Sequence, residues 1–170
     1  MMLPLLVLLV AGPREERPDE PKERLTVFVF TEQVDDETAQ KGKFPIRRVT
    51  DEVRKRVRDR KKWFVTSERH EGADVLVEVM RHTVEERMRT RMEYRVNETG
   101  NGKQIVDVTW TEEQHFIEAR VELEGGFQTL VEGRDVREQG GSLKGAASDL
   151  ALKLEELCRE RQDLVSSQAR

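Results

Sequence analysis

Residues 47–62 hold the densest group of side chains that could bind a ligand. Nine Lys and Arg residues stand there against three Asp and Glu, and Trp63 and Phe64 follow directly. Such a segment could contact nucleic acid or an anionic lipid surface, with Arg54, Arg58 and Lys61 as the candidate contacts. The alternative is the solvated outer face of an amphipathic helix. We favour the helix face, because 30 basic against 34 acidic residues leave the chain at −4, without the basic excess typical of nucleic-acid modules.

A row of arginines at every second position forms the second candidate, in residues 80–96. Its members are Arg87, Arg89, Arg91 and Arg95. The even positions of residues 80–96 are mostly apolar or aromatic-like, namely Met80, His82, Val84, Met88, Met92, Tyr94 and Val96. This period of two predicts an extended strand with one buried face and one solvated face.

Two roles are open for the solvated face that carries these arginines. The arginines could pair across the sheet with acidic residues of later strands and so fix the strand register; the candidate acids are Glu118, Glu122, Glu124 and Glu132. The face could instead be a flat charged platform that docks a partner protein or an anionic polymer. In the second case Arg87, Arg89 and Arg91 are partner-binding residues.

Catalytic, metal and cofactor signatures are not found in the sequence. The histidines lack the spacing of adjacent metal ligands, and His82 falls on the predicted buried face. The serines lie in no nucleophile-elbow motif, and the glycines form no phosphate loop. The single cysteine, Cys158, falls on the apolar stripe of a predicted helix and is expected in the core. We therefore expect no enzyme activity, no metal and no cofactor.

The N-terminal residues carry a localisation signal. Residues 1–12 include the apolar run LPLLVLLVA, which is too short to span a bilayer but has the length of a signal-peptide core. No Lys or Arg precedes the run, and no cysteine follows it to support a lipid anchor. Residues 13–24 are charged and rich in proline, which indicates a solvated linker. We expect export, to the periplasm or an equivalent compartment, and no further transmembrane span.

The remaining chain, residues 25–163, is expected to form one α+β domain with a flexible tail at 164–170. The predicted order is a strand at 25–30, a basic helix ending near Lys62, and a short strand from Trp63. Three or four longer strands and a closing helix to about Gln162 follow. We expect a two-layer sandwich, in which two helices cover one face of a mostly antiparallel sheet of five or six strands.

Several local features set the predicted strand registers. The apolar positions change from odd at Val75–Val79 to even afterwards, which indicates a β-bulge near Val79 or Met80 or burial on both faces. Either a hairpin near residues 85–86 or one long bent strand fits the pattern that follows. Residues 97–102 (NETGNG) predict a turn. A three-residue loop at Gly125–Gly126 is expected to pair Val121 with Val131, and Ser142 is the expected N-cap of the last helix.

A short motif resembles segments of known envelope proteins. Residues 72–79 (GADVLVEV), preceded by a helix and the aromatic strand at 63–65, are similar to small envelope-associated domains such as the N-terminal domain of the translocation protein TolB and the curli-secretion lipoprotein CsgG. The resemblance covers residues 25–84 and the closing helix. It implies a non-enzymatic envelope component that binds a protein or another part of the envelope. A cytosolic nucleic-acid or anion-binding module using residues 47–62 is the alternative.

Overall fold

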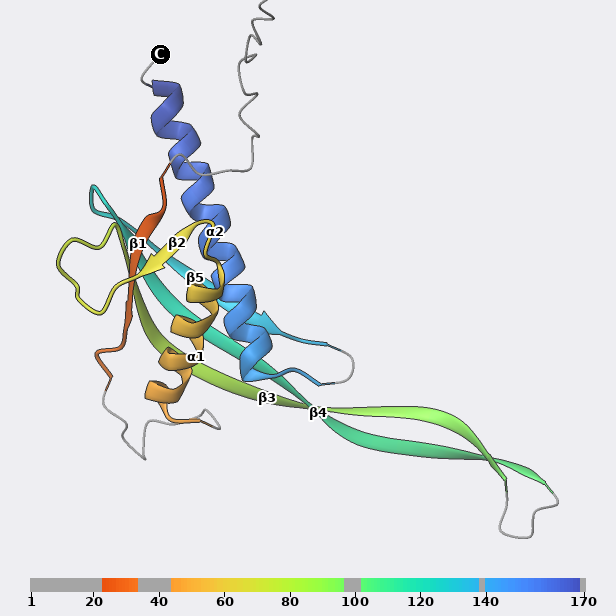
Figure 1. The fold of residues 1–170 in the computed structure, drawn as a ribbon. Helices are drawn as coiled ribbons and strands as arrows, with labels where there is room; N and C mark the ends of the chain where they lie inside the picture. The colour runs from red at the N-terminus through yellow and green to blue at the C-terminus, as the bar shows by residue number, and fades with distance from the viewer. Residues whose placement is uncertain (1–22, 34–43, 97–101, 138–139, 169–170) are drawn as a thin grey trace, which may run out of the picture.

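One mixed sheet and two helices make up the part of the chain that the structure describes (Figure 1). The computed structural model describes residues 23–33, 44–96, 102–137 and 140–168, and the side chains of the last helix through residue 162. The elements are β1 (Leu25–Phe30), α1 (Ile46–Asp59), β2 (Phe64–Thr66), β3 (Val75–Val96), β4 (Lys103–Leu123), β5 (Phe127–Asp135) and α2 (Leu143–Gln168). The predicted α+β sandwich and the predicted element order are confirmed.

The strand order across the sheet is β2-β1-β3-β4-β5. β1 runs parallel to both β2 and β3, whereas β3, β4 and β5 form an antiparallel meander. The parallel pairing of β1 with β2 follows from the helix α1 that connects them, because parallel neighbours need a crossover connection. The sheet is therefore mixed, with five strands among the described residues, and its longest pairings are antiparallel.

The β-bulge predicted near Val79 or Met80 is confirmed. Val79 pairs with Ala119 but Arg81 pairs with Glu118, so Met80 is the extra residue. The bulge keeps the core-facing positions on one side of the sheet, odd before it and even after it. β3 then continues as a single long strand, without the hairpin at 85–86.

The predicted register of the β4–β5 hairpin is wrong by two residues. The loop has the expected three residues, 124–126, but Leu123 faces Phe127 across it, so Val121 pairs with Thr129 and not with Val131. Arg120 consequently faces Leu130, and its ion pair goes to Glu78 on the other neighbouring strand. The predicted loop length is right, but the loop lies one residue earlier than the predicted register requires.

The core lies between the sheet and the helix pair. α1 packs on β1, β2 and β3, α2 packs on β4 and β5, and the two helices contact each other. The side chains that fill this layer are mostly valine, alanine and leucine, including Val27, Val29, Val49, Val53, Val77, Ile117, Ala147, Leu150 and Leu154. Cys158 is buried among them as expected, and burial raises the pKa of its thiol to about 12.

Small residues bring α2 close to the sheet. A Cβ atom placed on Gly133 of β5 would stand 2.6 Å from the Cβ of Leu150 and 2.8 Å from its backbone nitrogen. The carbonyl oxygen of Ala146 is closer still. No side chain fits there, so glycine at this strand position sets the distance between the helix and the sheet.

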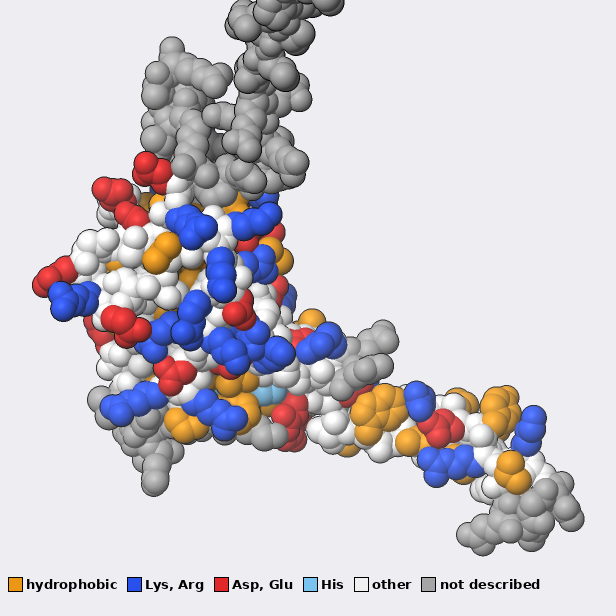
Figure 2. All heavy atoms as spheres, viewed as in Figure 1, with side chains coloured by type: hydrophobic (Ala, Val, Ile, Leu, Met, Phe, Trp, Pro, Cys, Tyr) orange, Lys and Arg blue, Asp and Glu red, His pale blue; other side chains and the backbone are white. Residues whose placement is uncertain are grey.

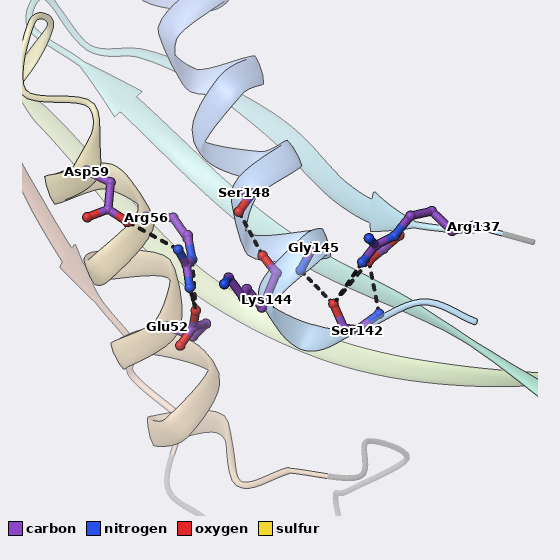
Figure 3. Close-up of polar contacts among 9 residues, drawn as sticks. Glu52, Arg56, Asp59, Arg137, Ser142, Lys144, Gly145 and Ser148 are labelled. Carbon is purple, nitrogen blue, oxygen red and sulfur yellow. Dashed lines mark hydrogen bonds and ion pairs between the residues drawn. The ribbon is translucent and has the colours of Figure 1, made fainter. Parts of the chain in front are cut away.

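Polar contacts fix the start of α2 at the end of β5 (Figure 3). The Ser142 hydroxyl accepts a hydrogen bond of 3.0 Å from the backbone N–H of Gly145, which confirms the predicted N-cap of α2. The buried carboxylate of Asp135 accepts bonds from Ser142 and from the Arg137 guanidinium. Burial alone would raise the pKa of Asp135, but these hydrogen bonds outweigh it and hold the pKa below its ordinary value.

The element ends differ from the expectation in two places. α1 begins at Ile46 and ends at Asp59, three residues before Lys62, while α2 continues to Gln168 and includes most of the segment expected to fray. The signal segment 1–12, nearly all of the linker 13–24 and the turn residues 97–101 lie outside the described residues. Among the helices that the structure describes, none has an apolar stretch long enough to cross a bilayer.

Candidate interaction surface

The β3–β4 hairpin extends well beyond the rest of the sheet (Figure 1). Strand β1 pairs with β3 only as far as Glu78, and β5 pairs with β4 only as far as His115. Residues 87–96 of β3 and 103–112 of β4 therefore have only each other as strand neighbours; we call these residues the arm. The two helices do not cover the arm either, because they pack on the body of the sheet and leave Met88, Met92 and Tyr94 at least 75% exposed.

One face of the arm is apolar and open to solvent. Large fractions of its hydrophobic side chains are exposed: Met88 80%, Met92 75%, Tyr94 76%, Val96 67% and Ile105 55%. Figure 2 shows apolar side chains along the arm. These residues follow on from the core-facing positions His82 and Val84, so the face that carries the core continues uncovered onto the arm. We call it the apolar arm face.

The predicted buried face of residues 80–96 is thus wrong over its second half. The period of two correctly indicates a strand, and His82 is buried as expected. From Met88 onward the same alternation lies in water, because no helix reaches that far. An alternating pattern specifies that the two faces differ, but the covering layer decides which residues are dry.

The opposite face of the arm carries the predicted arginines. Arg89 donates to the Glu112 carboxylate at 3.1 Å, and the Trp110 ring nitrogen donates to the same carboxylate at 2.9 Å. The Arg91 guanidinium lies 5.5 Å from the centre of the Trp110 ring. Glu112 is buried under this cluster, although it stands on a two-stranded ribbon. The side chains of Arg89 and Trp110 therefore shield part of this face, including the Glu112 carboxylate, from solvent.

Glu93 forms ion pairs with both outer arginines of the arm, Arg91 and, at 3.3 Å, Arg95. The hydrogen bond from Arg91 lowers the pKa of the Glu93 carboxyl below its ordinary value, and Arg95 adds to the effect. Arg87, Arg89 and Arg91 are all exposed and occupy one side of the arm, as the sequence predicted.

The expected pairing of these arginines with the acids of later strands is wrong. Glu118 pairs with Arg81 at 2.6 Å, and Glu122 accepts a hydrogen bond from Gln128. These acids belong to the body of the sheet, where β4 faces residues before position 84 of β3. The arginines lie farther out, opposite residues 104–112. The register of β3 against β4 fixes this separation, and Arg89 pairs with Glu112, which is not among the four predicted acids.

The basic candidates of α1 form a separate group on the helical layer. Arg54 is held by two hydrogen bonds of 2.8 Å, one to Asp51 and one to the carbonyl oxygen of Val29. Arg58 and Lys61 are exposed. Figure 2 shows Lys and Arg side chains gathered over the part of the molecule where α1 and α2 lie. These three residues are not brought together with the arginines of the arm.

A histidine pair lies at the base of the arm. The ring nitrogen Nε2 of His82 is 3.1 Å from Nδ1 of His115, and the ring of Phe44 stacks on both imidazoles. Burial, together with the neighbouring His115, lowers the pKa of His82 from 6.5 to about 4. His115 also lies 3.6 Å from the Glu113 carboxylate. Within the described ranges, no group of three His, Cys, Asp or Glu residues is arranged to hold a metal ion.

The residues that sequence reasoning missed are the exposed apolar ones, above all Met88, Met92 and Tyr94. The sequence signal for these exposed residues is the length of the alternating run that contains them. An alternating run of 17 residues spans about 58 Å, roughly two to three times the length of a helix of 14–20 residues. The excess length indicates a hairpin that extends past its own core.

Comparison with known proteins assigns no family to the chain. Neither the scan of protein-family models nor the search of curated proteins gives a match.

Proposed function

We propose that this chain is a non-enzymatic, exported domain that binds a protein or another component of the cell envelope, with the arm as its binding element. The observation that carries the proposal is the apolar arm face. Its five large hydrophobic side chains are more than half exposed, on a ribbon that has no neighbour among the described residues. Exposed contiguous apolar patches on soluble domains generally mark interaction sites.

The geometry of the arm supports docking in two further ways. A two-stranded ribbon is marginally stable alone in water, so a partner packed on its apolar face would stabilise it. The opposite face presents Arg87, Arg89 and Arg91, which add charge specificity at the rim of a contact. Export is supported by the apolar run in residues 1–12 and by the resemblance of residues 72–79 to envelope-associated domains.

Site-specific photocrosslinking in the cells that make the protein tests the proposal. A photoreactive amino acid at Met92 should form adducts larger than the chain itself, in an envelope fraction. The same probe at Leu130 is the matched control, because Leu130 is an exposed apolar residue (62%) on the sheet body. Adducts that are equal at both sites, or full-length protein retained in the cytosol, would contradict the proposal.

An anion-binding role for α1 is the second candidate function. It is supported by the Lys and Arg side chains gathered over the helical layer (Figure 2) and by the exposure of Arg58 and Lys61. Ion pairs within the fold already hold Arg54, Arg56 and Arg60, which reduces the charge left for a polyanion. Salt-sensitive retention on heparin that is lost when Arg54, Arg58 and Lys61 are reversed in charge would favour this candidate over the arm.

A further inference from the structure

We infer that the apolar arm face packs against the same face of a second copy of this chain. In this arrangement the two arms lie face to face and antiparallel. The two-fold axis that relates them lies between the two faces, at the level of the Tyr94–Ile105 pair. The inference rests on the proposed function, since it takes the arm as the binding element, and it names the partner of that surface.

The register of the arm makes this face complementary to itself. Tyr94 pairs with Ile105, Met92 with Asp107 and Val96 with Lys103. A two-fold axis in the plane between the faces, perpendicular to the strands at Tyr94–Ile105, places each strand over its own copy and reverses its direction. Tyr94 then meets Tyr94 of the second copy, Ile105 meets Ile105, and Met92 meets Val96. Every apolar side chain of the central stretch faces an apolar one.

The charges on this stretch obey the same symmetry. Its only charged residues are Lys103 and Asp107, which stand two positions on either side of Ile105. The two-fold axis brings Lys103 of one copy over Asp107 of the other, twice in the dimer. Within a single copy the two side chains are about 14 Å apart along the strand and do not pair. In a chain with 38% charged residues, a face with one charge of each sign at symmetric positions matches a second copy of itself.

The size of the face determines how tight the contact is. The stretch that overlaps its own copy, residues 92–96 and 103–107, measures about 17 Å by 10 Å, so the two copies cover about 340 Å² together, well below the 1,200 Å² or more of a stable interface. The strong twist of a two-stranded ribbon also limits how far two arms stay aligned. We therefore expect a weak, reversible dimer with a dissociation constant of about a millimolar.

Sedimentation equilibrium of the full chain over a wide concentration range tests the inference, with charge swaps as the perturbation. Lys103→Asp or Asp107→Lys alone opposes like charges at both symmetric contacts and should weaken dimerisation about tenfold or more. The double variant K103D/D107K restores opposite charges only between copies, so it should return the dissociation constant to the original value. Arg95→Asp is the matched control, since it makes the same charge change at the same end of the arm on the opposite face.

The outcomes separate this inference from the proposed function. Dimerisation that weakens in both single variants, recovers in the double variant and is unchanged by Arg95→Asp supports the two-fold contact. A chain that stays monomeric at every concentration overturns the inference, as does a dimer whose affinity ignores the charge swaps. If the chain is monomeric but Met92 crosslinks to an envelope component, the inference fails and the proposed function stands. If Met92 crosslinks only to a second copy, the inference stands and the envelope partner is rejected.

Discussion

Truncating an apolar side chain on β3 should cost much more stability at the start of the strand than at its far end. Val77→Ala removes two methyl groups from a side chain that is 1% exposed. At ~0.8 kcal/mol per buried methylene plus the cavity left behind, we expect the free energy of unfolding to fall by about 2–3 kcal/mol. Met92→Ala removes a side chain that is 75% exposed. Only about a quarter of a typical 2 kcal/mol burial term is lost, so we expect a cost of about 0.5 kcal/mol.

Urea unfolding followed by circular dichroism measures both variants against the unchanged chain. The protein should be as dilute as the signal allows, so that contacts between copies do not contribute. The slope of the transition should stay the same in all three proteins, which shows that only stability has changed. A loss of 2 kcal/mol or more in dilute Met92→Ala would mean that the arm packs on the body of the domain, and it would refute the exposed face from which the proposed function is argued.

Three further predictions concern the sheet body and the base of the arm. Gly133→Ala should lower the free energy of unfolding by about 3 kcal/mol, because its Cβ would meet the backbone of α2, whereas Leu130→Ala on the same strand should cost under 1 kcal/mol in the same urea titration. The pKa of His82 falls from 6.5 to about 4 on folding, so the unfolded chain binds more protons than the folded chain between these pH values. The free energy of unfolding should therefore drop by about 3 kcal/mol as pH falls from 6.5 through 4. His82→Phe should flatten this pH dependence, and an unchanged slope would show that another group causes it. Asp135→Asn should destabilise the fold by about 2 kcal/mol at neutral pH. The lowered pKa of Asp135 contributes stability at pH values above the ordinary pKa of the carboxyl, and this stability is lost as pH falls through the folded-state pKa, so the difference between the variant and the unchanged chain should shrink in acid. A loss that is constant with pH would contradict the role of the ionised carboxylate.

The sequence is a good guide to the elements of this fold where the physical cause is local. Alternation over Val75–Val79 and the later shift to even positions specify a strand with a bulge, because a bulge is the simplest way to keep one face buried through a change of parity. Ser142 caps α2 because its hydroxyl is the right distance from the N–H three residues on. Both features depend on neighbours in the chain, so both could be predicted.

Features that depend on the extent of a distant element were not predictable in the same way. Val77 and Met92 both stand in alternating runs, and the place where α1 and α2 pack on the sheet decides that Val77 is buried and Met92 exposed. The partner of Arg89 is set likewise by the register of β3 against β4, which places Glu112 and not Glu118 within reach. Counting strand residues against helix length would have indicated the arm before the structure did.

Oxidation of the methionines by dilute peroxide, followed by peptide mass spectrometry, tests the exposed arm most directly. Met80 at the bulge is partly buried, whereas Met88 and Met92 on the arm are 80% and 75% exposed. In dilute protein we predict that Met88 and Met92 oxidise nearly as fast as in the unfolded chain and clearly faster than Met80. Raising the protein concentration or adding a bound partner should slow Met92 while leaving Met80 unchanged. Slow oxidation of Met88 and Met92 in dilute protein would contradict the account.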